Sequence, residues 1–353
     1  MKRICLAGRH VRPYMENAAR NGWRVAALDG FNDWDARRFG TLVPAPRCGG
    51  PEEFFSAVSA LPDWPLILCS PAESNPAILK DFSNARQILN APAQAVAACR
   101  DFNFLRRLTG DGIDLPETSF GQGNGEKGWI IKNHRSAGGT GIRPDDDRPL
   151  GPREFRQKVV AGDSVGAVYF SSGGRALLAG IARHINHGWL FAGGIYPAAV
   201  DGSVYATIER FGQRLSSAAG LKGWWGADFI LGEKIYLLEV NPRFTASLEL
   251  VAGAHGIDVV DTQLRAMDDG CHIPLERPAG YYGRMVCYAE KDCEFTDAQA
   301  WFERGARDIP HPGSTIKKGA PVLSLYAQAA SAAECKQRLD EQSGCLRREL
   351  HGL

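Results

Sequence analysis

Residues 224–243 read WWGADFILGEKIYLLEVNPR, and this stretch decides the fold. Alternating polar and apolar side chains flank Gly232-Glu233, a pattern that predicts a β-hairpin with a two-residue turn pairing Leu231 with Lys234. Because side chains alternate along a strand, one face of the hairpin should carry Asp228, Leu237, Glu239 and Asn241. The opposite, apolar face should carry Phe229, Leu231, Tyr236, Leu238 and Val240.

The polar face of this hairpin has the chemistry of a metal site. Two carboxylates and an amide oxygen, from Asp228, Glu239 and Asn241, converge there beside Arg243. Mg²⁺ binds hard oxygen ligands and usually takes only one or two protein carboxylates, with phosphates and water completing its shell. The hairpin therefore predicts a Mg²⁺ site that serves a phosphate-bearing substrate.

A glycine-rich segment about 90 residues upstream, IIKNHRSAGGTGI over residues 130–142, suggests where the phosphates bind. Small residues let backbone N–H groups approach phosphate oxygens, and Lys132 at the end of the preceding strand supplies a fixed positive charge. No Gly-Lys-Ser/Thr follows, so the segment is not a Walker loop. His134 has two open interpretations, a base or phosphate contact and a loop-packing residue.

Composition limits the function classes. The chain has 353 residues, 41 Lys and Arg against 40 Asp and Glu, and no apolar run near the roughly 18 residues of a membrane helix. A net charge of +1 gives no global field for nucleic acid or an anionic membrane. Nine cysteines without a Cys-x-x-Cys pair indicate neither zinc nor a disulfide framework and favour a cytoplasmic protein.

The chain order predicts three units. Strands near 3–7, 25–28 and 66–69 with helices around 11–21, 51–60 and 75–88 indicate a small parallel α/β sheet. Gly8-Arg9-His10 lacks the glycine pattern of a dinucleotide site, and Asp29 fits either a ribose contact or a turn. The remaining expected elements are a helix near 92–108, a helix near 153–160 after the acidic loop 145–147, strands near 164–170, 176–184 and 189–194, a helix along Val204, Ile208, Phe211 and Leu215, strands 283–289 and 321–327, and a final helix near 331–350.

These motifs together resemble the ATP-grasp superfamily. The similarity rests on Ile130-Ile131-Lys132 before the glycine-rich loop, on Gly162-Asp163-Ser164, and on residues 226–244, with further likeness at 88–118 and 308–322 to the carboxylase-related branch. The resemblance implies an α/β and α+β chain with a Rossmann-like pre-ATP-grasp domain at 1–98, an ATP-grasp domain at 99–272 and a small β-rich closing domain at 273–353.

The resemblance also assigns roles. Lys132 would contact the base and phosphates of ATP, the loop from Ser136 through Gly138, Gly139, Thr140 and Gly141 would cover the β- and γ-phosphates, and Asp163 would bind the ribose. Asp228, Glu239 and Asn241 would hold one or two Mg²⁺ ions, or Mn²⁺. Arg243, Arg183 and His134 would face the reacting groups. Relatives commonly carry Lys after the position of Asp101, whereas Phe102 stands here, which leaves two alternatives: Arg106 or Arg107 replaces that charge, or the nucleotide is held more loosely.

The implied activity is an ATP-dependent carboxylate–amine ligase that works through an acyl phosphate. Within the superfamily the chain is most similar to the carboligase group that includes tyramine–glutamate ligases of methanofuran-type coenzyme biosynthesis, which implies a small carboxylic acid and an amine as substrates and a homodimer. Two alternatives stay open, a bicarbonate-using carboxylase and a non-catalytic nucleotide-binding subunit.

Overall fold

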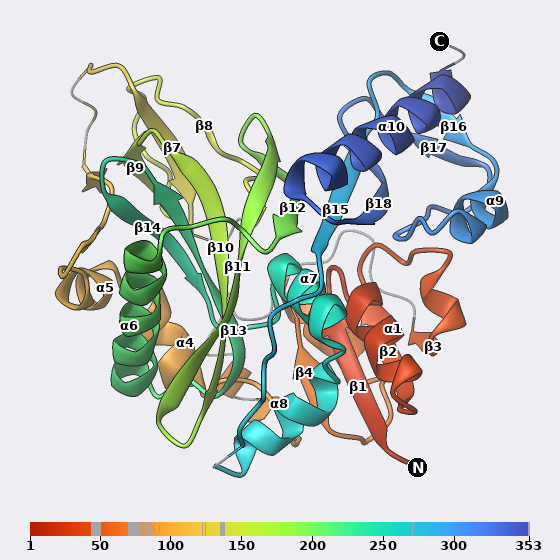
Figure 1. Cartoon of the computed structure of the whole chain (residues 1–353), viewed down its shortest axis with the longest axis horizontal. Coiled ribbons are helices and arrows are strands. Elements are labelled where there is room, and N and C mark those ends of the chain that lie inside the picture. The colour runs from red at the N-terminus through yellow and green to blue at the C-terminus, as the bar shows by residue number, and fades with distance from the viewer. Residues whose placement is uncertain are drawn as a thin grey trace.

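The structure, a computed structural model, describes residues 1–43, 51–69, 79–80, 82–83, 86–121, 123, 125–134, 138–269 and 271–351. Three bodies of secondary structure follow one another along the chain, and the first and last lie side by side (Figure 1). None of the helices in these described ranges is both long and apolar enough to cross a membrane.

The N-terminal body is a four-stranded parallel sheet in the order β3-β2-β1-β4. Its strands are β1 (Arg3–Gly8), β2 (Arg24–Asp29), β3 (Thr41–Val43) and β4 (Leu66–Leu68). Its helical segments are α1 (Arg12–Arg20), η1 (Ala36–Arg38) and α2 (Pro51–Val58). The predicted sheet is confirmed, while half of the residues of the helix expected at 75–88 lie outside the described residues.

An eight-stranded sheet in the order β18-β15-β12-β11-β10-β13-β14-β5 forms the centre of the molecule. Its strands are β5 (Ile113–Asp114), β10 (Asp163–Ser172), β11 (Arg175–His187), β12 (Leu190–Tyr196), β13 (Gly223–Leu231), β14 (Ile235–Asn241), β15 (Tyr281–Tyr288) and β18 (Pro321–Ala329). The last two strands come from the expected closing domain, so the sheet runs without a break across the expected boundary at 272/273.

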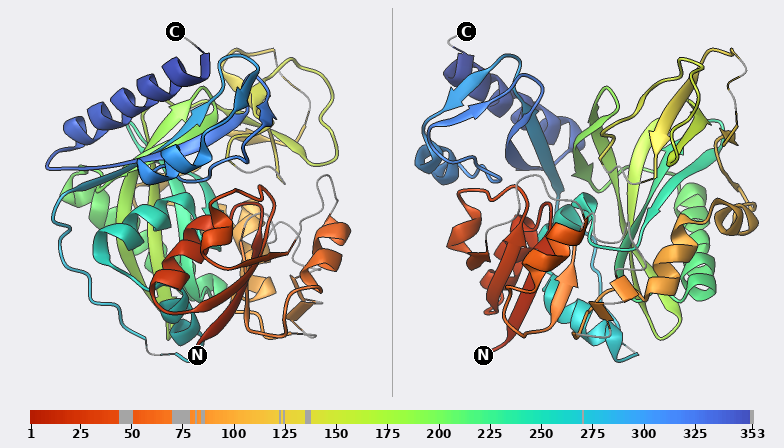
Figure 2. Two further views of the ribbon diagram at one scale, coloured as in Figure 1. Left: turned by 90° about the vertical axis from the view of Figure 1, so that its right-hand side faces the viewer. Right: turned by 180° about the vertical axis from the view of Figure 1, so that it is seen from behind.

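Helices cover both faces of this sheet (Figures 1 and 2). On one face α6 (Gly202–Ala219) buries Ile208, Phe211 and Leu215, as its apolar stripe predicts. On the other face lie α7 (Ala246–His255) and α8 (Val259–Met267), whose apolar residues share a core with α1.

A second four-stranded sheet, in the order β6-β9-β7-β8, stands beside β14 (Figure 1). Its strands are β6 (Thr118–Ser119), β7 (Trp129–Asn133), β8 (Arg143–Pro144) and β9 (Glu154–Lys158). The prediction of a helix near 153–160 is wrong. The segment is a strand because β7 pairs with it along its whole length and because Arg156 is buried, donating to the Asp145 carboxylate at 2.7 Å.

The helix expected over 92–108 is two helices, α4 (Ala93–Arg100) and α5 (Phe102–Leu108). Asp101 between them is extended, with φ −84° and ψ 109°, and its carboxylate accepts hydrogen bonds from the backbone N–H groups of Asn103 and Phe104. An aspartate that caps a new helix in this way ends the preceding one. The break turns the last residue of α4, Arg100, toward the small sheet.

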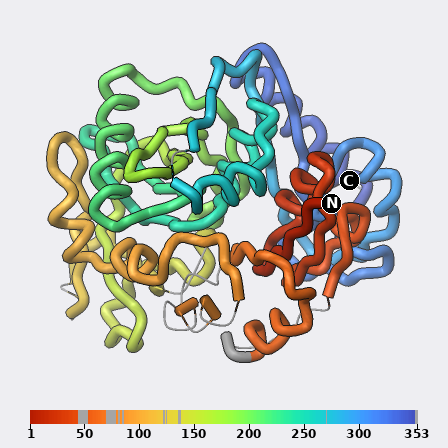
Figure 3. Tube along the Cα trace, turned by 90° about the horizontal axis from the view of Figure 1, so that it is seen from below, coloured from red at the N-terminus to blue at the C-terminus, as the bar shows by residue number. Residues whose placement is uncertain are grey.

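The C-terminal body continues from β15 with three short elements, β16 (Cys293–Phe295), α9 (Ala298–Glu303) and β17 (Ser314–Ile316), before β18, and with the long helix α10 (Ala332–His351) after it. It packs beside the N-terminal body, as Figure 3 shows for the red and blue parts of the chain. The strands expected at 283–289 and 321–327 and the final helix are confirmed.

The hairpin of residues 224–243 forms, but its predicted register is wrong. Leu231 pairs with Ile235, which leaves residues 232–234 in the turn, because β5 pairs with Ile235 and Asp114 binds the Lys234 ammonium at 2.7 Å. Farther along, Phe229 pairs with Leu237 but Asp228 pairs with Glu239, so Leu238 is an extra residue, a β-bulge.

The bulge reverses the predicted positions of two leucines. Leu237 is fully buried in the core beneath α6, together with Val240, whereas Leu238 lines a cavity next to Glu239. One inserted residue lets Leu238 and Glu239 both face the cavity, which strict alternation along the strand forbids.

Leu237→Asp should therefore destabilise the protein by about 4 kcal/mol or more, because it puts a carboxylate without a partner into the core. Leu238→Asp, the matched change one residue away, should cost less than about 1 kcal/mol, as a change at a cavity wall does. Urea unfolding followed by circular dichroism measures both, and equal losses would contradict the bulge.

Candidate functional site

The carboxylates of Asp228 on β13 and Glu239 on β14 lie together at the bulge. The amide Nδ2 of Asn241 donates to both, at 3.2 Å from Asp228 Oδ2 and 3.1 Å from Glu239 Oε1. Its own Oδ1 accepts from Arg243 Nη2 at 3.0 Å, so this arginine orients the amide. The structure thus brings together the three residues that the hairpin pattern selected as metal ligands, with Arg243 directly behind them.

The two carboxylates have opposite electrostatic surroundings. Burial and the adjacent Glu239 carboxylate raise the pKa of Asp228 well above its usual range. Burial opposes ionisation of Glu239 as well, but Lys132 and Arg100 more than compensate and bring its pKa to about 2. A carboxylate pair of this kind, with Glu239 in the wall of a cavity and Asp228 beside it, suits a divalent cation, and its residues fit Mg²⁺.

A cavity opens from this pair toward the small sheet. Its wall is made of residues from α4, α5, β7, β9 and β14, namely Cys99, Arg100, Phe102, Leu105, Leu115, Thr118, Phe120, Lys132, Asn133, His134, Phe155, Gln157, Leu238, Glu239 and Val240. One end is apolar and aromatic, while the other carries Lys132, Arg100 and Glu239. A flat heterocycle attached to a polyanion matches this division.

The aromatic end includes His134. Its ring lies 4.6 Å from Phe155 and stacks with Phe120 at 6.1 Å, with an angle of 6° between the planes. Burial, followed by the charges of Arg100 and Lys132, lowers the pKa of His134, so the imidazole is neutral at pH 7. This position favours the packing interpretation of His134 and places it in the cavity wall.

Lys132 lies on β7 and points into the same cavity. Its Nζ is 3.3 Å from Gln157 Oε1 and 5.9 Å from the centre of the Phe155 ring. Since its charge helps to lower the pKa of Glu239, the ammonium lies within electrostatic reach of the carboxylate pair across the cavity. The small sheet and the large sheet therefore meet at opposite charges.

The glycine-rich loop lies against the connection between β11 and β12. Ser136 falls outside the described residues, whereas Gly138, Gly139, Thr140 and Gly141 are described. Gly139 has φ +79°, and a Cβ there would overlap the carbonyl oxygen of Trp189, so only glycine fits. The N–H of Phe191 donates to the Gly138 carbonyl at 3.1 Å, which anchors the loop to β12.

Arg183 and Asp163 are not brought to the carboxylate pair. They bind each other, with 2.7 Å between Arg183 Nη1 and Asp163 Oδ1, and about half of each side chain is exposed. On β11, Arg183 shares a face with Ile181, which belongs to the core under α6. Arg183 therefore lies on the face of the sheet opposite His184, and its assignment to the reacting groups stays a prediction.

The neighbouring His184 occupies the place expected for Arg183. Its Nε2 is 3.9 Å from Asp228 Oδ1, and its Nδ1 is 3.0 Å from Ser164 Oγ. Burial lowers its pKa to about 4, so it is a neutral imidazole beside the carboxylate pair. The sequence analysis assigned this place to Arg183. Arg183 and His184 are consecutive on β11 and point to opposite faces of the sheet, and this distinguishes them.

Arg100 is the second residue that sequence reasoning missed. It lines the cavity and acts on Glu239 and His134, while Arg106 and Arg107, the expected sources of this charge, are exposed on α5. The positively charged side chain, Arg100, therefore lies one residue before Asp101, whereas relatives commonly carry Lys one residue after that position. The helix break at Asp101 was the signal that could have identified it.

Comparison with protein families and sequences gives a partial match. Residues 101–247 match the family model described as ATP-grasp domain. The carbamoyl phosphate synthase large chain of Clostridium beijerinckii is 26% identical over 115 residues, which are 31% of this chain and 11% of that relative. The same protein of Thermoanaerobacter pseudethanolicus is 32% identical over 108 residues, 29% of this chain and 10% of the relative. The chain thus matches about a tenth of the length of these relatives.

Solved structures resemble the whole chain. A biotin carboxylase β,γ-ATP complex from Campylobacter jejuni has a TM-score of 0.73 at 12% identity and covers 96% of this chain and 89% of its own. The L-amino acid ligase from Bacillus licheniformis has a TM-score of 0.72 at 16% identity, with 97% and 96% covered. The biotin carboxylase domain of Hydrogenobacter thermophilus 2-oxoglutarate carboxylase, a dimer in complex with MgADP and bicarbonate, has a TM-score of 0.73 at 13% identity, with 96% and 89% covered. At these identities the shared property is the fold.

Glu239→Gln should remove Mg²⁺-dependent ATP turnover by more than about 100-fold and leave the melting temperature unchanged, because a direct metal ligand loses its charge. The matched control is Glu233→Gln, an exposed residue in the turn of the same hairpin. ADP release against Mg²⁺ concentration measures the effect, and wild-type turnover in Glu239→Gln would contradict the metal site.

Arg100→Met should weaken ATP binding about 10- to 100-fold, the value of one or two charge-assisted contacts. Arg106→Met, an exposed arginine on the adjacent helix, should change the affinity less than about twofold. Isothermal titration calorimetry with a non-hydrolysable ATP analogue measures the affinity of both variants. A larger loss of affinity in Arg106→Met than in Arg100→Met would assign the phosphate-binding charge to α5.

Proposed function

We propose that this chain, which contains an ATP-grasp domain over residues 101–247, is an ATP-dependent ligase that joins a carboxylic acid to an amine through an acyl phosphate. The observation that carries the proposal is the meeting of Asp228, Glu239 and Asn241 with Lys132 and Arg100 across one aromatic-walled cavity. The cavity suits a purine at its aromatic end and a metal-bound triphosphate at its charged end.

The residues divide the work of binding ATP. Phe120, Phe155 and His134, whose rings pack against one another, form the apolar wall for the base, and Lys132 and Arg100 bind phosphate oxygens. The loop through Gly138 and Gly141 brings backbone N–H groups over the terminal phosphates. Asp163, at the start of β10, exchanges its bond to Arg183 for the ribose hydroxyls.

Asp228, Glu239 and Asn241 would hold Mg²⁺, or Mn²⁺ in its place, and the ion would supply positive charge to the triphosphate. The acid's carboxylate oxygen attacks the γ-phosphorus, the bond to the bridging oxygen breaks, and ADP leaves. The amine then attacks the acyl carbon, phosphate leaves, and one proton is released. Arg243 stabilises the negative oxygens in both steps.

The carboxylate–amine reaction is our first choice because the L-amino acid ligase resembles this chain over nearly the whole length of both proteins. A bicarbonate-using carboxylase is the second candidate, favoured by the equal likeness to biotin carboxylases. Both share the first step and differ in the acid that is phosphorylated. These 353 residues contain no Ala-Met-Lys-Met biotinylation segment.

The finer assignment concerns the substrates and the assembly. We infer glutamate or a related amino acid as the acid and an amine such as tyramine as the acceptor, in the synthesis of a one-carbon coenzyme of methanofuran or pterin type. The enzyme would act in the cytoplasm as a homodimer, with residues 1–98, 99–272 and 273–353 as its pre-ATP-grasp, ATP-grasp and closing domains.

The test is ADP and phosphate release with Mg·ATP across a matrix of amino acids and amines, with bicarbonate alone in a separate arm. The ligase predicts release that needs one acid and one amine together, and a product lighter than their sum by one water. Glu239→Gln serves as the inactive control. Release that depends on bicarbonate alone would replace the ligase by the carboxylase, and the absence of turnover in every arm with bound ATP would favour a nucleotide-binding subunit.

A further inference from the structure

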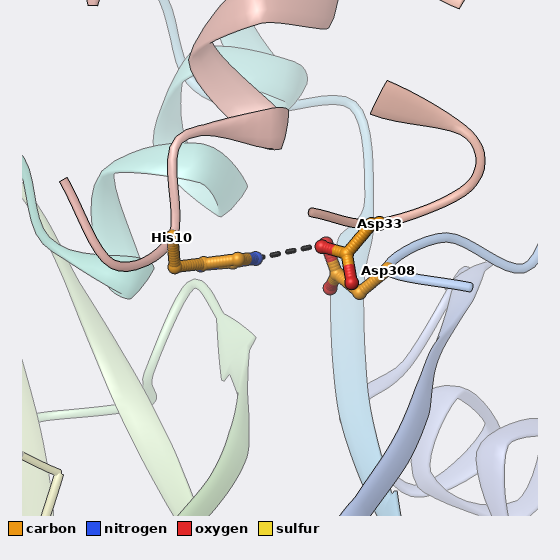
Figure 4. A group of neighbouring side chains, drawn as sticks. All are labelled: His10, Asp33 and Asp308. Carbon is orange, nitrogen blue, oxygen red and sulfur yellow. Dashed lines mark hydrogen bonds and ion pairs between the residues drawn. The ribbon is translucent and has the colours of Figure 1, made fainter. Parts of the chain in front are cut away.

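A second group of potential metal ligands lies where the N-terminal and C-terminal bodies meet. His10 follows β1, Asp33 precedes η1, and Asp308 lies between α9 and β17. One donor atom from each of the three side chains lies within 4.8 Å of the other two. Figure 4 shows the two carboxylates side by side and the imidazole pointing at them.

One oxygen of this group lacks a partner. Asp33 is 8% exposed, and its Oδ2 makes no hydrogen bond to any described residue. The same holds for Oδ2 of the nearby Asp29, which is 1% exposed. A buried carboxylate oxygen without a donor is costly, so its presence points to a cation or proton that completes it.

The cations around the group are already shared among other carboxylates. Arg12 donates from Nε to Asp308 at 2.7 Å, from Nη1 to Glu16 at 2.9 Å and from Nη2 to Glu249 at 3.2 Å. Arg284 likewise divides between Asp308 at 2.8 Å and Glu249 at 3.3 Å. Arg12 also lies 3.9 Å from Asp35 Oδ2, so these two guanidinium groups pair with four carboxylates before Asp29 and Asp33 are counted.

Protonation is the alternative way to lower this negative charge. Burial, and then the charges of Asp308, Asp29 and Asp35, raise the pKa of Asp33 well above its usual range. Burial raises the pKa of Asp29 to about 6. Two protons would be needed to neutralise Asp33 and Asp29 one by one. A single doubly charged ion beside Asp33 would offset the negative charge of both and would also use the imidazole of His10.

We propose that His10, Asp33 and Asp308 bind one divalent transition-metal ion, with Zn²⁺ as the best match, at the junction of the two ends of the chain. One imidazole nitrogen and two carboxylate oxygens form a mixed nitrogen–oxygen set that Zn²⁺ accepts and Mg²⁺ does not prefer. Ligand atoms around a tetrahedral zinc lie about 3.4 Å apart, so shifts of about an ångström close the site.

The ion would connect the loop after β1 to the segment after α9. His10 Nε2 now lies 2.8 Å from Asp308 Oδ1, and this nitrogen becomes a ligand when its proton is released to solvent. Because His10 and Asp308 are almost 300 residues apart in sequence, the ion acts as a cross-link between the first and last bodies. Binding should therefore raise the melting temperature of the whole protein.

The experiment uses the full chain carrying Glu239→Gln, so that the Mg²⁺ site of the proposed function is disabled and cannot account for the result. The chain is dialysed against Zn²⁺ with excess Mg²⁺, and bound zinc is measured by mass spectrometry together with the melting temperature. We expect one zinc ion per chain that depends on His10 and Asp33, a higher melting temperature, and at least about tenfold weaker binding after His10→Gln or Asp33→Asn. His311→Gln, a nearby histidine outside the group that contacts the Asn32 carbonyl, is the matched control.

Substitution of Co²⁺ for Zn²⁺ adds a direct signature, because cobalt bound to nitrogen and oxygen ligands absorbs visible light according to its geometry. The absorption should vanish in His10→Gln and persist in His311→Gln. If Asp33→Asn fails to fold, the His10→Gln result alone decides. Equal zinc content and equal cobalt spectra in the parent and in folded His10→Gln would overturn the proposal.

Discussion

Asp228 and Glu239 repel each other, and the groups that surround them are placed so that they offset this repulsion. Two carboxylates lie together on adjacent strands, and bringing them together costs energy unless hydrogen-bond donors or opposite charges are near. The chain supplies a neutral donor from Asn241 on the same hairpin, and positive charge from Lys132 on the small sheet and Arg100 at the end of α4. The small sheet must stand beside β14 for this arrangement, and a cation that joins the substrate completes it.

A single inserted residue gives the site its geometry. The bulge at Leu238 allows the apolar side chain and the Glu239 carboxylate to face the cavity together, while Leu237 and Val240 stay in the core beneath α6. The apolar wall and the metal ligand therefore come from consecutive residues. Bulges are frequent next to active sites because they redirect a side chain at little cost to the sheet.

The junction between the N-terminal and C-terminal bodies obeys the same electrostatic rule. Arg12 and Arg284 are almost completely buried and are surrounded by carboxylates from three parts of the chain. Breaking such a network leaves buried charges unpaired, which makes the relative position of the bodies specific. At the hairpin, we propose that the excess negative charge binds a cation that arrives with the substrate. At the junction, we propose that it binds a metal ion that belongs to the protein itself.

Local patterns in the sequence determined much of this protein. The parallel N-terminal sheet, the stripe of α6 and the grouping of Asp228, Glu239 and Asn241, which we propose as metal ligands, all follow from short-range periodicity, because burial alternates with the geometry of each element. The tertiary structure alone decided the bulge, the strand at 154–158, and the choice of His184 and Arg100 over Arg183 and Arg106. These depend on which strand pairs with which and on where a helix ends. Such pairings are contacts between residues far apart in the chain, and a local pattern carries no information about them.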